Sequence, residues 1–309
     1  MRKLSIVVAA YNEAGNLPLL YQRVCALDWV KLDLEVEFVF VDDHSNDGTL
    51  RILRELAAQD PRVKVLRFSK NFGSHKAFTA GLEHCTGDAA VILAADLQDP
   101  PEAIPQLIVK WRAGVKVVWA VRAAREGVSM IDQLFANFYY ILMRKYAEVQ
   151  PPREGADFLL ADRCVLQELR AAPEKNTSVL LLIQWMGFPQ DFINYTKGTR
   201  HSGRSNWTFA KKLKLAIDSL ASFSYAPIRL ASLMGLFFGA TGFIYAFFIA
   251  TKAIWWSNPV QGWPALMCVV LITAGAQLLI LGALGEYLWR NYEETRSRPR
   301  FIIEERINL

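Results

Sequence analysis

The sequence predicts an α/β domain with a mostly parallel sheet, followed by two helices that cross a membrane. In roughly the first 200 residues, short β-rich runs alternate with helical patterns, which is typical of a parallel sheet covered on both faces. Residues 230–251 and 259–285 contain no charged side chain, and each stretch exceeds the ~20 residues needed to cross a bilayer core. Two buried core helices are the alternative for these stretches.

The elements of the predicted sheet follow one another closely along the chain. The strands are predicted at residues 4–10, 35–42, 62–68, 89–95 and 115–121. The helices between them are "NLPLLYQRVCAL", "DGTLRILRELAAQ", "HKAFTAGLEHC" and "PEAIPQLIVKWRA". After residue 122 we expect a helix over 130–147, a strand in "ADFLLAD", helices up to residue 187, a strand in "DFINYTK" and the loop "GTRHSGRSNW".

The change in composition after this loop sets the predicted domain boundaries. "TFAKKLKLAIDSLASFSYAPIRL" has the pattern of an amphipathic helix on a membrane surface, with a cytosolic packing helix as the alternative. The predicted organisation is an α/β domain over 1–205, a juxtamembrane helix over 206–229, two spans within 230–289 (about 230–256 and 262–288) and a tail over 290–309.

Basic residues flank both spans, whereas the link between them, "SNPVQG", carries no charge. By the positive-inside rule the N-terminal domain and the C-terminal tail are then both cytoplasmic. The four cysteines show no metal or redox spacing, which is typical of reduced thiols in a cytosol-facing protein. The net charge of +5 lies mostly near the spans, so it favours contact with anionic lipid over nucleic-acid binding.

Three predicted strands end in polar, mostly acidic residues: Tyr11-Asn12-Glu13, Asp42-Asp43 and Asp96-Leu97-Gln98-Asp99. Ligands of open parallel sheets bind beyond the carboxyl ends of the strands, so these ends predict a binding site. Helix capping is the alternative for each one. "DDHSNDGT" contains capping residues, and we expect Asp99 to cap the helix that begins at "PPEAIPQL".

The phosphate-binding glycine motifs G-x-G-x-x-G and G-x-x-x-x-G-K-[ST] are both missing from the sequence. Carboxylates without such a loop indicate a nucleoside diphosphate held through a divalent cation. Mg²⁺ or Mn²⁺ is the expected ion, because both take oxygen ligands and share them between carboxylates and phosphates.

Four successive motifs, "SIVVAAYNE", "VFVDDHSNDGT", "FSKNFGSHKAFTAGL" and "AADLQDPPE", resemble those of family 2 glycosyltransferases with the GT-A fold. "RHSGRSNW", "SFSYAPIRL" and the two spans are similar to the polyprenyl-phosphate branch. That branch includes dolichol-phosphate mannose synthases and the bacterial undecaprenyl-phosphate (bactoprenol) glucosyltransferases. The resemblance implies inverting transfer of a hexose, with glucose favoured, from a UDP-sugar to undecaprenyl phosphate. It places the enzyme in the bacterial inner membrane, where the lipid-linked sugar serves glycan or O-antigen modification.

The resemblance also implies roles for particular residues. It implies a nucleotide-sugar site formed by Tyr11, Asn12, Glu13, Asp42, Asp43 and Lys76. Asp96 and Gln98 fall on the metal and pyrophosphate positions, and Asp157 matches an acidic residue near the donor sugar. Arg122, Arg200 and Arg204 are the expected contacts to the acceptor phosphate or the departing diphosphate, so the predicted catalytic residues are Asp96, Asp157 and Arg122.

One position departs from the family pattern: Ala94 stands where many relatives have the first acid of a D-x-D motif. This leaves open a metal site with one carboxylate fewer, a site that has lost its chemistry, or a non-catalytic nucleotide-sugar-binding subunit. The donor sugar is open too, with GDP-mannose, a UDP-N-acetylhexosamine and aminoarabinose as alternatives. A processive polysaccharide synthase is disfavoured, because "LIQWMGF" lacks the arginine of a Q-x-x-R-W signature.

A phosphate acceptor changes what the site has to do. The second pKa of a phosphate monoester is about 6, so the acceptor is mostly dianionic at pH 7 and needs no strong general base. Cations must instead hold two anions together, and Arg200 and Arg204 precede the membrane helix where a lipid phosphate would be met. Binding of lipid headgroups by these arginines is the plainer alternative. The spans serve as an anchor, and "GLFFG" is a weak indication of a homo-oligomer.

Overall fold

The computed structural model of the chain describes residues 1–122, 141, 158–172, 174, 178–196, 198, 226–255, 262–296 and 298–309. The chain divides into two compact units, one formed by Met1–Ala216 with Pro299–Leu309 and the other by Ile217–Arg298. The predicted helix over 130–147 and most of the predicted juxtamembrane helix lie outside the described residues.

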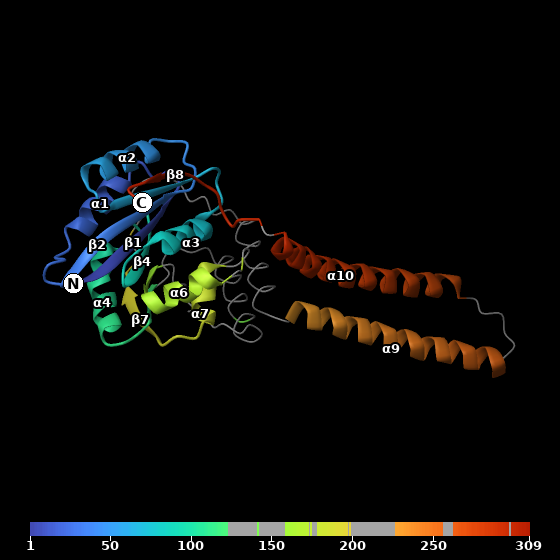
Figure 1. The fold of residues 1–309 in the computed structure, drawn as a ribbon. Helices are drawn as coiled ribbons and strands as arrows, with labels where there is room; N and C mark the ends of the chain where they lie inside the picture. The colour runs from blue at the N-terminus through green and yellow to red at the C-terminus, as the bar shows by residue number, and fades with distance from the viewer. Residues whose placement is uncertain are drawn as a thin grey trace. The chain divides into compact units, whose positions relative to one another are not determined.

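The first unit is built on a mixed, mostly parallel sheet, as the sequence predicts (Figure 1). Its described strands follow the order β7-β5-β6-β4-β1-β2-β3-β8. β6 runs antiparallel to β4 and β5, β8 runs antiparallel to β3, and the other pairs are parallel. The strand bounds are β1 Arg2–Ala10, β2 Leu34–Asp42, β3 Val63–Phe68, β4 Ala89–Ala94, β5 Val117–Arg122, β6 Phe158–Asp162, β7 Gln190–Tyr195 and β8 Ile303–Ile307.

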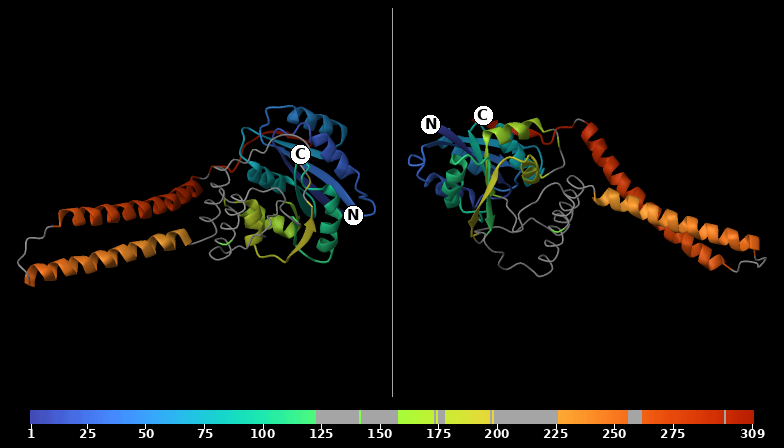
Figure 2. Two further views of the ribbon diagram at one scale, coloured as in Figure 1. Left: turned by 180° about the vertical axis from the view of Figure 1, so that it is seen from behind. Right: turned by 90° about the horizontal axis from the view of Figure 1, so that it is seen from below.

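Helices cover both faces of this sheet (Figures 1 and 2). α1, α2 and α4 pack on one face and α3, α6 and α7 on the other, so each face has its own apolar core. Their bounds are α1 Leu17–Cys25, α2 Thr49–Gln59, α3 Ser74–His84, the short 3₁₀ helix η1 Pro101–Ala103, α4 Ile104–Arg112, α6 Arg163–Ala171 and α7 Val179–Trp185.

The sequence explains this two-sided packing. β2 is buried without a break from Val36 to Val41, and all of these residues except Glu37 are apolar, as expected for a central strand covered on both faces. α3 approaches the sheet closely at Gly81, where an added Cβ atom would lie 2.2 Å from Cγ1 of Val7. Only glycine permits this approach, which sets α3 close against β1.

The second unit consists of α9 (Ala226–Trp255) and α10 (Trp263–Thr295), which lie side by side (Figures 1 and 2). The Cβ position of Gly235 on α9 lies 3.3 Å from Cδ1 of Ile280 on α10, whereas Gly239 has no atom within 4 Å of its Cβ position. Large apolar side chains face outward, as at Phe243, which is 75% exposed. Within the described residues, the segment Ile272–Thr295 is long and apolar enough to cross a membrane, and Ala231–Tyr245 forms a shorter apolar segment.

Candidate active site

The structure brings the polar strand ends together at one edge of the sheet. β4, β1 and β2 are parallel neighbours, with Ala9 paired to both Ala94 and Val41, and Ala10 paired to Asp42. The residues that follow these strands therefore emerge side by side. β5 and β7 point the same way as β4, because β6 runs antiparallel between β4 and β5.

Asp43 is the most strongly perturbed acid at this edge. The residue is only 3% exposed, and its carboxylate accepts hydrogen bonds from the backbone amides of Phe72 (2.6 Å) and Gly73 (2.9 Å). Burial raises the pKa of Asp43 to about 6; the two amide donors oppose this rise, and neighbouring Asp42 adds to it. Asp43 is thus an acceptor at neutral pH that gains a proton under mildly acidic conditions.

Asp42 lies beside it and is fully buried. Its Oδ1 atom accepts a hydrogen bond from the amide of Ser45 (3.1 Å). Its Oδ2 atom has no hydrogen-bond partner among the described residues, which is unusual for a buried carboxylate oxygen. Such an oxygen can accept a hydrogen bond from an N–H group of a ligand.

The loop after β1 is tied to the loop after β2 by local hydrogen bonds. The Asn12 amide donates to Oγ of Ser45, Oδ1 of Asn12 accepts from the amide of Asn46, and the Glu13 amide donates to Oγ1 of Thr49, all at 2.9 Å. Asn12 and Glu13 therefore hold the two loops together. Tyr11 is partly exposed beside them.

The loop after β4 carries Asp96 and Gln98. Oδ1 of Asp96 accepts a hydrogen bond from the amide of Gln98 at 3.2 Å, and Leu97 between them has φ 61°. Asn12 and His44 have similar positive φ values, so the loops after β1, β2 and β4 each contain a left-handed residue. For leucine this conformation costs roughly 1–2 kcal/mol, and strain of this kind is common at functional sites.

The predicted capping role of Asp99 is wrong. Neither η1 nor α4 has a side-chain cap, and Asp99, 1% exposed, accepts a hydrogen bond from the hydroxyl of Tyr195 at 2.5 Å. Burial and Asp99 raise the pKa of Tyr195, and a hydrogen bond between its hydroxyl and Arg122 opposes that rise. Arg122 also pairs with Tyr195 across β5 and β7. The buried Asp99 and Tyr195 and the partly exposed Arg122 thus form one cluster, and Asp99 belongs to the loop that also carries Asp96.

Tyr195 was not among the residues predicted from the sequence. The signal was nevertheless present, because Tyr195 ends the predicted strand in "DFINYTK" and so follows the same rule as the acidic strand ends.

Three predicted site residues, Asp157, Arg200 and Arg204, lie outside the described residues. The residues next to them in the chain that the structure does describe lie at the same edge of the sheet as Asp43 and Asp96. Phe158 begins β6 and pairs with Ala120, two residues before Arg122. The Gly198 amide donates a hydrogen bond to the carbonyl of Gln98 at 2.8 Å.

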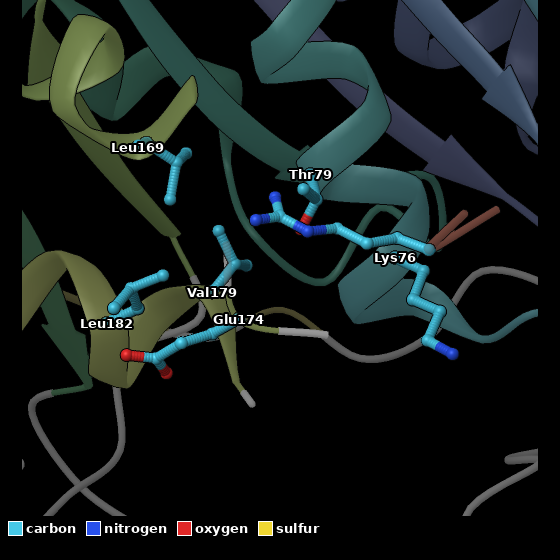
Figure 3. Close-up of a pocket in the computed structure, with 7 residues that line it drawn as sticks. Lys76, Thr79, Leu169, Glu174, Val179 and Leu182 are labelled. Carbon is cyan, nitrogen blue, oxygen red and sulfur yellow. The ribbon is translucent and has the colours of Figure 1, made fainter. Parts of the chain in front are cut away.

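Lys76 lies in the first turn of α3, with its ammonium 5.9 Å from the ring centroid of Phe72. It borders a shallow pocket, and its ammonium points away from the apolar lining of that pocket (Figure 3). The pocket is lined by Lys76, Thr79, Leu169, Glu174, Val179, Leu182 and Arg300.

The residues at this edge suit one kind of metal site. Among the described residues, no group of three or more His, Cys, Asp or Glu side chains is arranged to hold a metal ion. The loop after β4 offers the carboxylate of Asp96 and the amide oxygen of Gln98, whereas its second carboxylate, Asp99, accepts a hydrogen bond from the hydroxyl of Tyr195. Mg²⁺ and Mn²⁺ commonly bind one or two carboxylates together with substrate phosphates and water. The donor set therefore fits a cation shared with a diphosphate, and it does not fit a site made of protein ligands alone.

The sheet and its acidic edge are those of a GT-A-like glycosyltransferase. Residues 5–168 match the family model described as "Glycosyl transferase family 2". The chain belongs to this family.

Full-length relatives are also found. The uncharacterized glycosyltransferase YkcC of Bacillus subtilis is 39% identical over 302 residues, covering 97% of this chain and 93% of the relative. The bactoprenol glucosyl transferase of Shigella phage SfX is 38% identical over 304 residues, covering 98% and 99%. Among solved structures, glucosyl-3-phosphoglycerate synthase from Mycobacterium tuberculosis, in complex with Mn²⁺, UDP and phosphoglyceric acid, is similar with a TM-score of 0.50. It is 18% identical and covers 71% of this chain and 76% of that one, a likeness of fold alone.

Proposed function

We propose that this glycosyltransferase transfers a hexose, with glucose favoured, from a UDP-sugar to undecaprenyl phosphate, with inversion at the anomeric carbon. The observation that carries the proposal is the likeness to the phage bactoprenol glucosyl transferase, which spans 98% of this chain. That span includes the α/β unit and both apolar helices, so the membrane part and the catalytic part are related together.

The donor site in this proposal is the edge formed by β1, β2 and β4. Asp42 and Asp43 are the acceptors for the nucleoside, because one buried Asp42 oxygen has no hydrogen-bond partner among the described residues and Asp43 is held by two amides. Tyr11 borders the same loops. Lys76 lies in the first turn of α3, just after the loop that binds Asp43, and in this proposal its ammonium meets the negative charge of the donor.

Asp96 and Gln98 are the residues that would hold Mg²⁺ or Mn²⁺ in this proposal. The bound cation would supply positive charge to the donor diphosphate as it departs. Ala94 provides no ligand, so the remaining places fall to phosphate oxygens and water.

The acceptor side requires cations and no strong base, since the lipid phosphate is already a nucleophile at neutral pH. Arg122 seats that phosphate or the departing diphosphate. Its side chain is hydrogen-bonded to the hydroxyl of Tyr195, which in turn donates to Asp99. Arg200 and Arg204 follow within a few residues of Gly198, whose amide is hydrogen-bonded to the carbonyl of Gln98. In this proposal the two arginines complete the phosphate site. Asp157 orients a sugar hydroxyl.

The chain connectivity supports a two-helix membrane hairpin with both flanking segments on one side of the membrane, and the basic residues that flank the spans favour the cytoplasmic side. The chain leaves the first unit before α9 and rejoins it after α10, where β8 pairs with β3 of the same sheet. If α10 crosses the membrane, α9 must cross it too, because the sheet cannot lie on both sides.

The test is transfer by the purified full-length protein in detergent. Undecaprenyl phosphate is incubated with UDP-glucose, UDP-galactose, UDP-N-acetylglucosamine or GDP-mannose, and the lipid product is identified by mass spectrometry. We expect hexosylated lipid from UDP-glucose. Product from another donor alone would reassign the sugar. Binding of UDP-glucose without product from any donor would identify a nucleotide-sugar-binding subunit, the alternative that Ala94 leaves open.

A further inference from the structure

The chain beyond α10 returns to the catalytic sheet and covers its edge. β8 pairs antiparallel with β3, with Val65 opposite Ile307 and Arg67 opposite Glu305. The pairing continues past the end of β3, where the Ser69 amide donates to the carbonyl of Ile302 at 3.0 Å. An uncovered edge strand invites pairing with other chains, and β8 removes this risk for β3. The segment that contains β8 also makes side-chain contacts that are not needed to cover this edge.

A line of contacts runs from β8 to the donor edge. The ring of Phe301 stacks on the buried Phe68, with 5.1 Å between centroids and 23° between planes. Phe68 in turn meets Phe72 edge to face at 5.4 Å and 83°. The amides of Phe72 and Gly73 are the donors that hold the Asp43 carboxylate. Phe301 is therefore two ring contacts away from the loop that fixes Asp43.

Ion pairs seat the same segment on the surrounding helices. Glu305 forms a bidentate salt bridge with Arg54 of α2, with N···O distances of 3.1 and 2.6 Å. Nη1 of Arg300 lies 3.0 Å from Oε1 of Glu83 on α3. Arg300 also lines the pocket that includes Lys76, whose labelled lining is drawn in Figure 3. The segment thus contacts α3 as well as the loop that precedes it.

We propose that residues 300–305 are a positioning element of the donor site, which holds the loop over residues 69–73, and through it Asp43, in the geometry that binds a nucleoside diphosphate. This deepens the proposed function and rests on it only for the role of Asp43. The segment follows α10 directly in the chain, so the donor site is complete only after the chain has returned from the apolar helices.

The far end of β8 provides a matched control. Nδ2 of Asn308 donates to the carbonyl of Ala57 in α2 (2.8 Å) and to that of Val63 at the start of β3 (2.9 Å), away from the donor edge. Asn308 has φ 58°, so Asn308→Gly removes both hydrogen bonds without backbone strain. Phe301→Ala removes the ring that stacks on Phe68.

The experiment compares both variants with the wild-type, full-length protein by hydrogen exchange and by UDP binding in the presence of Mn²⁺. Loss of the ring contact opens the loop locally, so we expect Phe301→Ala to speed amide exchange in peptides covering residues 69–76 about tenfold and to weaken UDP binding by a similar factor. Asn308→Gly should leave both quantities at the wild-type level. Phe301→Tyr, which keeps the ring, should restore them.

Equal exchange of residues 69–76 in Phe301→Ala and Asn308→Gly would overturn the proposal, as would faster exchange with unchanged UDP affinity. If Phe301→Ala does not fold, Phe301→Leu keeps the apolar volume without the stacked ring, and the same comparison applies. Hydrogen exchange needs no substrate. Failure of the wild-type protein to glycosylate undecaprenyl phosphate would therefore contradict the proposed function while the exchange result still decides this inference.

Discussion

Replacing Tyr195 by phenylalanine removes one hydroxyl from the cluster of Asp99, Tyr195 and Arg122. The ring stays, so packing against Phe158, whose centroid is 5.8 Å away, is kept. Asp99 loses the donor that lies 2.5 Å from its Oδ1 atom, and Arg122 loses its hydrogen bond to the hydroxyl. The change therefore tests whether this cluster positions Arg122 for phosphate.

The magnitude follows from burial. Asp99 is 1% exposed and Tyr195 is 6% exposed, so water has little room to replace the lost hydroxyl. A buried hydrogen bond to a charged group contributes about 1.5–3 kcal/mol. If the transition state, with the lipid phosphate bound, loses that much stabilisation, the kcat/KM for undecaprenyl phosphate falls roughly 10- to 100-fold, because 1.4 kcal/mol corresponds to a factor of ten.

Tyr21→Phe is the matched control, because Tyr21 also donates to a carboxylate. Its hydroxyl lies 2.6 Å from Oδ2 of Asp60, which follows α2 and precedes β3 at the opposite edge of the sheet. Steady-state transfer is measured with UDP-glucose and undecaprenyl phosphate varied separately, alongside thermal unfolding. We expect both variants to lower Tm, and Tyr195→Phe alone to lower kcat/KM for the lipid.

Two outcomes would refute this reasoning. Wild-type kcat/KM in Tyr195→Phe would show that Arg122 is positioned without the hydroxyl. An equal loss of kcat/KM in both variants would show that the effect comes from stability alone.

Three further predictions concern single acidic residues. Glu37→Gln should lower the free energy of unfolding by about 3 kcal/mol and Tm by about 6–10 °C. The reason is that Glu37 is 1% exposed and accepts hydrogen bonds from Ser5, Thr86 and Lys64. A Tm within 2 °C of wild type would contradict this. The pKa of Asp43, about 6 in the fold against an ordinary 3.8, contributes stability at low pH that is lost as pH rises through 6. Relative to wild type, Asp43→Asn should therefore gain up to about 3 kcal/mol between pH 4 and pH 7, seen in thermal unfolding; a difference independent of pH would rule this out. Transfer should stop in EDTA and resume with Mg²⁺ or Mn²⁺ in the wild-type protein but not in Asp96→Asn, and EDTA-resistant transfer would remove the metal from the account.

Local patterns in the sequence were enough to predict the central sheet. The alternation of apolar strands and amphipathic helices predicts the parallel core, and the rule that ligands bind beyond strand ends brings Asp43 and Asp96 to one edge. Both inferences need only neighbouring residues and the direction of parallel strands.

Contacts between distant parts of the chain escaped prediction. Asp99 precedes two prolines and an acid, a local pattern typical of a helix start, yet its partner Tyr195 is 96 residues away. The segment over 290–309 is predicted as a tail with no strand, yet Ile303–Ile307 pairs with β3. In both cases the energy of burial comes from a partner that no local periodicity identifies.

The central claim is that the nucleophile that attacks the donor sugar is the phosphate of a lipid and not an alcohol. The most direct measurement incubates the full-length protein with radiolabelled UDP-glucose and either undecaprenyl phosphate or undecaprenol, then follows label in the lipid and determines the anomeric configuration of the product by NMR. The account predicts labelled lipid from the phosphate alone, with the β configuration. Equal labelling of undecaprenol, or an α-linked product, would contradict it.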